Sequence, residues 1–265
     1  MSLLARFPSL LRAETAEQYS VSIRLRVGGL AFVLYSRDTG EQVYSDEYSL
    51  QSGFPSYKSA VEDLYFRYPF LSYPYHSVRV LYEPLVYTLV PADLYQEGSA
   101  ALWLRPIADE YSVGRAEDWE VYTSELPDKQ KLLVSAADKS LLQFLRRSML
   151  VVEPEAFLSP FISEQGLLAR KYGRKLLSMI LRPTALDCLL FEEGELIFAN
   201  SFPLSLSLTE SAEELLYYVM LLWRNYNCSQ SEDRLFIHPD EQALQATACR
   251  LEQLLEKFIS KINLG

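Results

Sequence analysis

Histidine and cysteine are scarce in this sequence, which limits the metal and nucleophile chemistry open to it. The chain has 265 residues, of which two are histidine and three are cysteine. Cys188, Cys228 and Cys249 have no CxxC spacing, and no group of His, Cys and Asp has the spacing of a zinc or iron site. An odd, scattered set of cysteines is typical of free thiols in a reducing compartment. We therefore expect a cytoplasmic protein without a metal site.

The motifs that mark nucleophiles and phosphate-binding loops are also missing. The patterns G-x-S-x-G, G-x-x-x-x-G-K and G-x-G-x-x-G do not occur, so the sequence supplies no catalytic residues and indicates no cofactor. No apolar run approaches the ~18–20 residues of a membrane span, and residues 1–18 lack a continuous signal core. The formal net charge of −10 disfavours partners with phosphate backbones or anionic lipids. We expect neither nucleic acid nor membrane as a partner.

What the chain does have is a sizeable apolar content, 49%, and a pattern that occurs twice. Residues 19–50 and 175–204 each read as three strands joined by two tight turns, with the period-two alternation of half-buried strands or with continuous apolar runs. The matched pairs include Ser22 with Ser178, Arg26 with Arg182, Leu30 with Leu186, Tyr44 with Phe198, and Tyr48 with Phe202.

The same order of elements follows both copies. Helical spacing predicts a helix over 56–68 after the first copy and one from Thr209, as N-cap, to about Tyr226 after the second. A short strand next to a proline then follows in each, over 78–82 and 235–239. The shared order β-β-β-α-β predicts a structural duplication.

The remaining segments complete two lobes of unequal length. Apolar spacing predicts a closing helix over 240–262. Between the copies, a helix over 136–147, a strand over 150–152 and a helix over 154–170 complete the first half. We expect a first lobe over 1–170, with an insertion at about 85–133, and a second, shorter lobe over 171–265.

Two copies of a β-β-β-α-β-α-β-α unit resemble the ribonuclease-H-like fold of the actin, heat-shock chaperone and sugar-kinase superfamily. More narrowly, SIRLRVGGLAFVLY followed far downstream by LIFANSFPL is similar to an uncharacterised bacterial family with a degenerate actin-like fold. The resemblance covers most of the chain. It implies an α/β fold with duplicated ribonuclease-H-like βββαβαβα lobes in an actin-like ATPase architecture.

The resemblance also implies where ATP would bind, and the sequence departs from the pattern there. Active members present an Asp-x-Gly-Thr/Ser hairpin from each lobe, because glycine lets backbone N–H groups approach phosphate. Arg24 and Arg26 stand where the first Asp is expected. The second turn, 182–185, has no glycine and contains Pro183, and the turn after the later strand, 238–241, has two acids and no glycine. Hydrolysis of magnesium-ATP is therefore not expected.

Two sets of side chains carry the remaining site hypotheses. If the lobes face each other as in the superfamily, Arg26 and Arg182 would line one cleft and bind a nucleotide or other anion. The alternative is that they are two structural strand arginines repeated by ancestry. The candidate anion site comprises Arg26, Gly28, Gly29, Arg182 and Thr184. His238, beside Asp240 and Glu241, is a candidate for acid–base work or a structural histidine.

The 18 tyrosines suggest an interface, because tyrosine combines a large contact area with a polar tip; the alternative is half-buried packing. Our leading hypothesis is a non-catalytic protein that works through contacts with an unknown protein or with itself. The alternative is a nucleotide- or anion-binding module with the ligand between its lobes. An ATPase or kinase ranks third.

Overall fold

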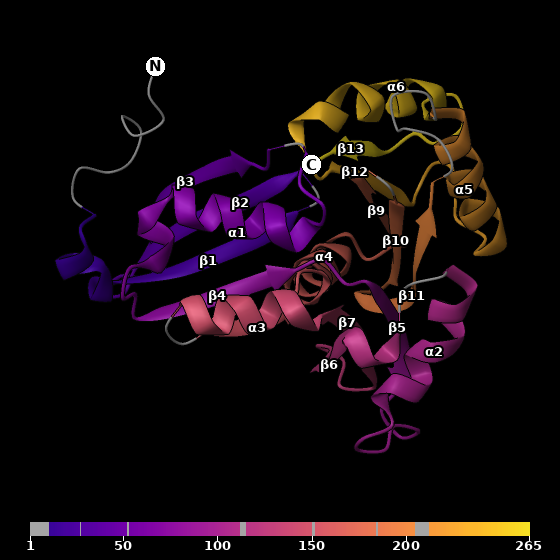
Figure 1. Ribbon diagram of the computed structural model, residues 1–265. Coiled ribbons are helices and arrows are strands. Elements are labelled where there is room, and N and C mark those ends of the chain that lie inside the picture. Colours follow the sequence, from indigo (N-terminus) through magenta and orange to yellow (C-terminus); the bar gives the residue numbers. More distant parts are fainter. Residues whose placement is uncertain are drawn as a thin grey trace. The chain divides into compact units, whose positions relative to one another are not determined.

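The chain has an α/β structure built around three β-sheets (Figure 1). The structure, a computed structural model, describes residues 11–26, 28–51, 53–111, 115–149, 152–183, 185–204 and 212–265, without the side chains of residues 110 and 111. The chain divides into two compact units. Unit 1 consists of Met1–Val86, Gln96–Thr123 and Val134–Leu158, and unit 2 of Tyr87–Tyr95, Ser124–Leu133 and Ser159–Gly265.

These units differ from the predicted lobes 1–170 and 171–265 in two places. The helix α4 (Leu158–Tyr172) groups with unit 2, although the sequence places it at the end of the first lobe. The inserted segment at about 85–133 is divided between the units. Both differences arise from long-range packing, which sequence order does not report.

Unit 1 is organised on a five-stranded sheet with the order β3-β2-β1-β4-β8. Its first three strands form an antiparallel meander, and β4 and β8 run parallel to β1. Val21, Ile23 and Leu25 of β1 are at most 2% exposed, as their alternation predicts. The strands are β1 (Tyr19–Arg26), β2 (Gly29–Ser36), β3 (Gln42–Ser49), β4 (Ser77–Tyr82) and β8 (Val152–Ala156).

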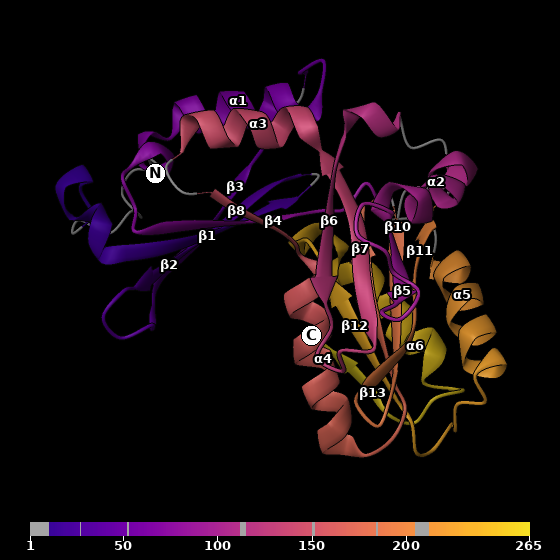
Figure 2. The same cartoon turned by 90° about the horizontal axis from the view of Figure 1, so that it is seen from below.

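Two helices, α1 (Tyr57–Arg67) and α3 (Lys139–Ser148), lie side by side on one face of this sheet (Figure 2). The hydroxyl of Ser56 caps α1 by accepting from the amide of Ser59. The carboxylate of Asp138 caps α3, so that helix begins three residues later than the predicted 136. The preceding residues belong to strand β7.

Unit 2 contains a second five-stranded sheet with the equivalent order, β11-β10-β9-β12-β13, and the same strand directions. Leu177, Met179 and Leu181 of β9 pack into one core with α5 and α6. On the other face, Ser178 donates a hydrogen bond to Gln165 of α4. The elements are β9 (Leu176–Arg182), β10 (Ala185–Glu192), β11 (Glu195–Pro203), α5 (Ala212–Asn225), β12 (Arg234–Pro239), α6 (Gln245–Leu255) and β13 (Ile262–Leu264). The predicted N-cap Thr209 lies outside the described residues.

The predicted closing helix over 240–262 is wrong in its second half. The helix α6 ends at Leu255, and Ile262 begins β13, a parallel edge strand paired with β12. Residues 251, 255, 258 and 262 keep helical spacing, which misled the prediction. In the structure Phe258 is 42% exposed while Ile259 is 2% exposed, a pattern that a continued helix with an apolar side at 258 would not give.

The inserted segment forms a three-stranded sheet, β5-β7-β6, with a helix. The segment that the sequence marks as an insertion, about 85–133, contains two of these strands, the start of the third and the helix α2. Four short 3-10 turns complete the described elements. These elements are β5 (Val86–Pro91), α2 (Ala100–Tyr111), β6 (Trp119–Glu125), β7 (Lys131–Asp138), and the turns η2 (Ala13–Gln18), η3 (Pro69–Ser72), η4 (Ala116–Asp118) and η5 (Gln242–Leu244).

Gly29 gives a test of the meander in unit 1. A Cβ at this position would overlap with the carbonyl oxygen of Tyr48 on β3, which is backbone and cannot rotate away. We expect Gly29→Ala to lower the free energy of unfolding by more than about 2 kcal/mol in urea titrations. Gly40→Ala is the control: φ is +71° and no atom lies within 4 Å of the added Cβ, so only about 1 kcal/mol of backbone strain is expected. Equal losses for the two variants would contradict the steric account.

Candidate functional site

Arg182 ends β9 and lies in a buried polar network of unit 2. Its Nη2 donates to Asp187 Oδ1 at 3.0 Å and to Ser201 Oγ at 2.9 Å, and its Nε lies 2.6 Å from Asp187 Oδ2. The hydroxyl of Tyr87 on β5 donates to Asp187 Oδ1 at 3.1 Å. Arg182 is 8% exposed and Asp187 is fully buried. The guanidinium therefore holds β9, β10 and β11 together and neutralises a carboxylate in the interior.

Burial and charge act together on Tyr87. The desolvation of its ring and the neighbouring Asp187 carboxylate raise the pKa of its hydroxyl well above the ordinary value of 10. The hydroxyl thus remains a hydrogen-bond donor at any physiological pH. A buried carboxylate needs such donors, since an unpaired buried charge is strongly destabilising.

Arg26, the aligned position in unit 1, has a comparable carboxylate partner. Its Nη1 lies 2.6 Å from Glu47 Oε1 on β3, and the Arg26 side chain is 16% exposed. Glu47 aligns with Ser201, the third-strand partner of Arg182. In both units, therefore, the arginine at the end of the first strand reaches across to the same place on the third strand. Each arginine therefore pairs with side chains of its own set of three strands.

The remaining predicted anion-site residues have separate placements. Gly29 is required by the close approach of β2 and β3, and the carbonyl of Gly28 accepts a hydrogen bond from Leu50 at 2.9 Å. Thr184 lies outside the described residues. Within unit 1 the structure brings Arg26, Gly28 and Gly29 to one hairpin end. That these residues bind an anion together with Arg182 stays a prediction.

His238 on β12 lies between two aromatic rings. It meets the Phe161 ring edge-on at a centroid distance of 4.9 Å and stacks on Phe236 at 6.0 Å. Burial lowers the pKa of His238 to about 4. The ring is therefore neutral at physiological pH, and its surroundings are those of a packing residue.

Metal ligands and thiols are the remaining candidate groups. Among them, no group of three or more His, Cys, Asp or Glu side chains is placed to hold a metal ion. Burial raises the pKa of the Cys188 thiol well above its ordinary value and that of Cys228 to about 11. A thiol with a raised pKa is a poor nucleophile at neutral pH.

Each unit has a surface hollow of its own. In unit 1, a hollow of about 580 Å³ lies beside the start of α3 and is lined by Leu85, Glu117, Asp118, Trp119, Asp138, Lys139, Ser140 and Gln143. In unit 2, a smaller and mostly apolar pocket of about 140 Å³ lies between α4 and the β10–β11 turn, with Phe191, Leu196 and Ile162 among its lining residues. Neither pocket contains a residue of the predicted anion site.

The tyrosines that suggested an interface are mostly packing residues. The eight clustered ones are all buried or half-buried, namely Tyr57, Tyr65, Tyr68, Tyr73, Tyr75, Tyr82, Tyr87 and Tyr95. Of the tyrosines whose side chains the structure describes, only Tyr217 is exposed, at 61%.

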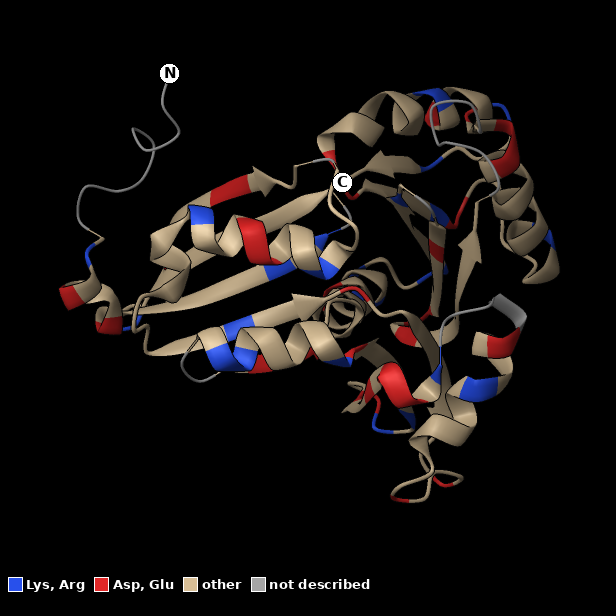
Figure 3. Cartoon of the chain, viewed as in Figure 1, with Lys and Arg blue, Asp and Glu red and all other residues tan. Residues whose placement is uncertain are grey.

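The described basic residues are scattered among acidic ones in Figure 3 rather than gathered into a stripe. In the described part of the chain, no helix has the length and apolarity to cross a membrane.

Comparison with known proteins places the chain in a family. Residues 9–262 match the family described as "Protein of unknown function (DUF3822)". The chain belongs to the DUF3822 family. Among curated proteins, none matches this sequence significantly.

Solved structures show the fold of this DUF3822 protein. A Bacteroides thetaiotaomicron protein of unknown function with an actin-like ATPase fold matches it with a TM-score of 0.80 and 22% identity, over 97% of this chain and 94% of that one. A chain of the PilM-PilN type IV pilus biogenesis complex matches with a TM-score of 0.59 and 12% identity, over 93% and 88%. The DUF3822 protein therefore has the actin-like ATPase fold, which confirms the expected fold class.

The Arg182–Asp187 pair gives the second prediction. Arg182→Met leaves a carboxylate buried without its cation, so we expect a loss of about 3–5 kcal/mol in the free energy of unfolding. Arg182→Met/Asp187→Leu removes both charges and is expected to lose less than the single variant, as measured by urea unfolding followed by circular dichroism. A single variant that loses under about 1 kcal/mol would contradict the structural role of the pair.

His238 gives the third prediction, a pH dependence. Its pKa is about 4 in the folded protein and about 6.5 when unfolded, so the unfolded chain binds more protons between these values. The free energy of unfolding should therefore fall, by up to about 3 kcal/mol, as the pH drops from about 6.5 to about 4. His238→Phe keeps a ring between Phe161 and Phe236 and should lack this part of the fall. Parallel pH profiles for the two proteins would contradict the prediction.

Proposed function

We propose that this DUF3822 protein is a non-catalytic, cytoplasmic protein that uses an actin-like fold for contacts with other protein surfaces. The carrying observation is that each of these arginines already has a carboxylate partner within its own set of three strands, Arg26 with Glu47 and Arg182 with Asp187. A phosphate at either hairpin would have to compete with these carboxylates. We further propose that the two equivalent sheets are an internal duplication whose nucleotide site is degenerate.

The structural neighbours support work in a complex. A chain with the same fold and a TM-score of 0.59 is a component of a pilus biogenesis complex, so the fold serves in at least one multi-protein assembly. The overall charge of −10 also fits protein partners better than nucleic acid or anionic lipid. The two hollows described above offer contact surfaces within single units.

The fourth prediction concerns nucleotides. We expect ATP, ADP and phosphate at millimolar concentration, with and without magnesium, to leave the melting temperature unchanged and to give no phosphate release above buffer. A ligand at 100 times its dissociation constant would add about 2.7 kcal/mol and raise the melting temperature by roughly 5–10 °C. The alternative function, an anion-binding module, predicts this rise.

The variant Arg26→Gln tests whether any such rise depends on the predicted anion site. The Glu47 partner of Arg26 is 63% exposed, so this change leaves no buried carboxylate unpaired, whereas a change at Arg182 leaves Asp187 buried without its cation. A magnesium-dependent rise that Arg26→Gln abolishes would overturn the proposal. Protein contacts are tested separately in native cell extract, where the 30.4 kDa chain should migrate well above its own mass. Migration as a free monomer would contradict them.

A further inference from the structure

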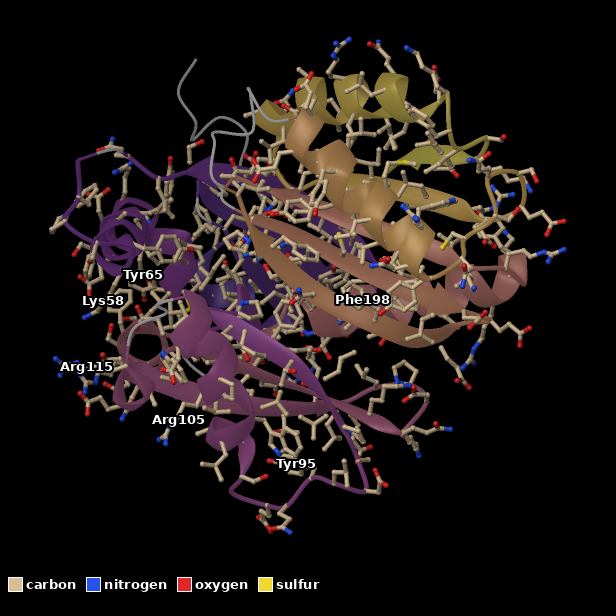
Figure 4. The ribbon with its side chains drawn as sticks, turned by 90° about the vertical axis from the view of Figure 1, so that its right-hand side faces the viewer. Lys58, Tyr65, Tyr95, Arg105, Arg115 and Phe198 are labelled. Atoms are coloured by element: carbon tan, nitrogen blue, oxygen red, sulfur yellow. The ribbon has the colours of Figure 1, made fainter. Side chains whose placement is uncertain are left out.

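The outward face of α5 is apolar between its first and last turns. Tyr217 is 61% exposed and Leu221 36%, while Leu216 and Met220 are half-buried beside them. The opposite side of the helix packs into the core of unit 2. Figure 4 shows α5 facing the viewer, with side chains directed outward. These side chains cost solvation energy unless another surface covers them.

An acidic residue lies at one end of this face and a basic residue at the other. Glu213 lies in the first turn and Arg224 in the last, and both are exposed. At about 100° per residue, positions 213, 217, 220 and 224 fall within about 60° of one another around the helix. Among the described residues, neither Glu213 nor Arg224 forms an ion pair. We call Glu213, Leu216, Tyr217, Met220, Leu221 and Arg224 the α5 stripe.

The α5 stripe is complementary to itself when turned end for end. In an antiparallel pair of α5 helices, Glu213 meets the partner's Arg224, Leu216 meets the partner's Leu221, and Tyr217 meets the partner's Met220. Every pair occurs twice about one two-fold axis, as an isologous interface requires. We propose that the α5 stripe is a homodimer interface, with a second copy of this chain as the partner.

The charge of the chain favours this surface over others for self-association. At −10, two copies repel each other, whereas the α5 stripe has one acid and one base and is locally neutral. A parallel arrangement would instead oppose Glu213 to the partner's Glu213. A single pair of 14-residue helices buries less than a standard interface of about 1,600 Å², so we expect a dimer with a micromolar dissociation constant.

The test is sedimentation equilibrium of the full chain from about 1 to 300 μM, a range centred on micromolar affinity. The mass should rise with concentration from 30.4 kDa toward twice that value. Leu221→Glu should keep the protein monomeric throughout. Leu167→Glu is the matched control: Leu167 is 68% exposed on α4 of the same unit, and its replacement should leave dimerisation unchanged. Thermal melts by circular dichroism confirm that both variants fold.

Charge reversal tests the antiparallel register. Glu213→Arg and Arg224→Glu each place like charges at both ends of the stripe and should weaken the homodimer at least fivefold. A mixture of the two variants, one with a fluorescent label, restores both attractive pairs and should dimerise at the original affinity. The doubly reversed chain should do the same.

Three results would overturn the proposal: a monomer at 300 μM, a dimer insensitive to Leu221→Glu, or single reversals that the mixture does not rescue. The inference is independent of the hairpin evidence behind the proposed function. A monomeric purified protein that is part of a larger assembly in native extract would remove the dimer and leave the proposed function intact.

Discussion

The ion pair between Arg182 and Asp187 is a buried polar constraint on the second half of this protein. Asp187 is fully buried on a strand whose neighbours are apolar, and a lone carboxylate there would cost several kcal/mol. The Arg182 guanidinium and the Tyr87 hydroxyl donate to this carboxylate, and the guanidinium also donates to the Ser201 hydroxyl, which forms one network. That network joins three consecutive strands to the inserted strand β5. These side-chain contacts among four strands therefore all depend on one buried ion pair.

This constraint bears on what the fold is used for. The resemblance to active members of the superfamily implies that backbone amides at the ends of these hairpins face a phosphate. Here the hairpin ends carry arginines whose charge is taken up by Asp187 in one unit and Glu47 in the other. The two solutions differ in depth, since Glu47 is 63% exposed and Asp187 is buried. The two arginine side chains are similarly buried, at 16% and 10% exposure, so the units differ in where the carboxylate lies.

Local sequence patterns predicted most of the fold. Period-two alternation predicted the meanders, and the matched order of elements predicted two equivalent sheets. The errors have physical causes. Residues 251 to 262 keep an apolar spacing of three or four across a helix and a strand, so periodicity alone extended the helix. The Tyr87–Asp187 contact joins residues 100 apart in the chain, and no local pattern reports such a distance. Asp187 itself was the one available signal for this contact. It lies in an apolar run, and a buried strand contains a charged residue only when that residue is paired.

Tyr65 of α1 and Tyr217 of α5 lie in different surroundings within their own units. Tyr65 on α1 is 7% exposed; its hydroxyl donates to the carbonyl of Ser148, and its ring lies edge-on to Phe144 of α3. Unit 1 therefore covers Tyr65 with a helix of its own. Tyr217 on α5 is 61% exposed. In unit 2 a tyrosine, whose ring gains most from burial when its hydroxyl stays near water, stands uncovered between a leucine and a methionine. The helix α6 packs into the same core as α5 and leaves Tyr217 exposed, so a surface from another chain is the simplest cover for this tyrosine.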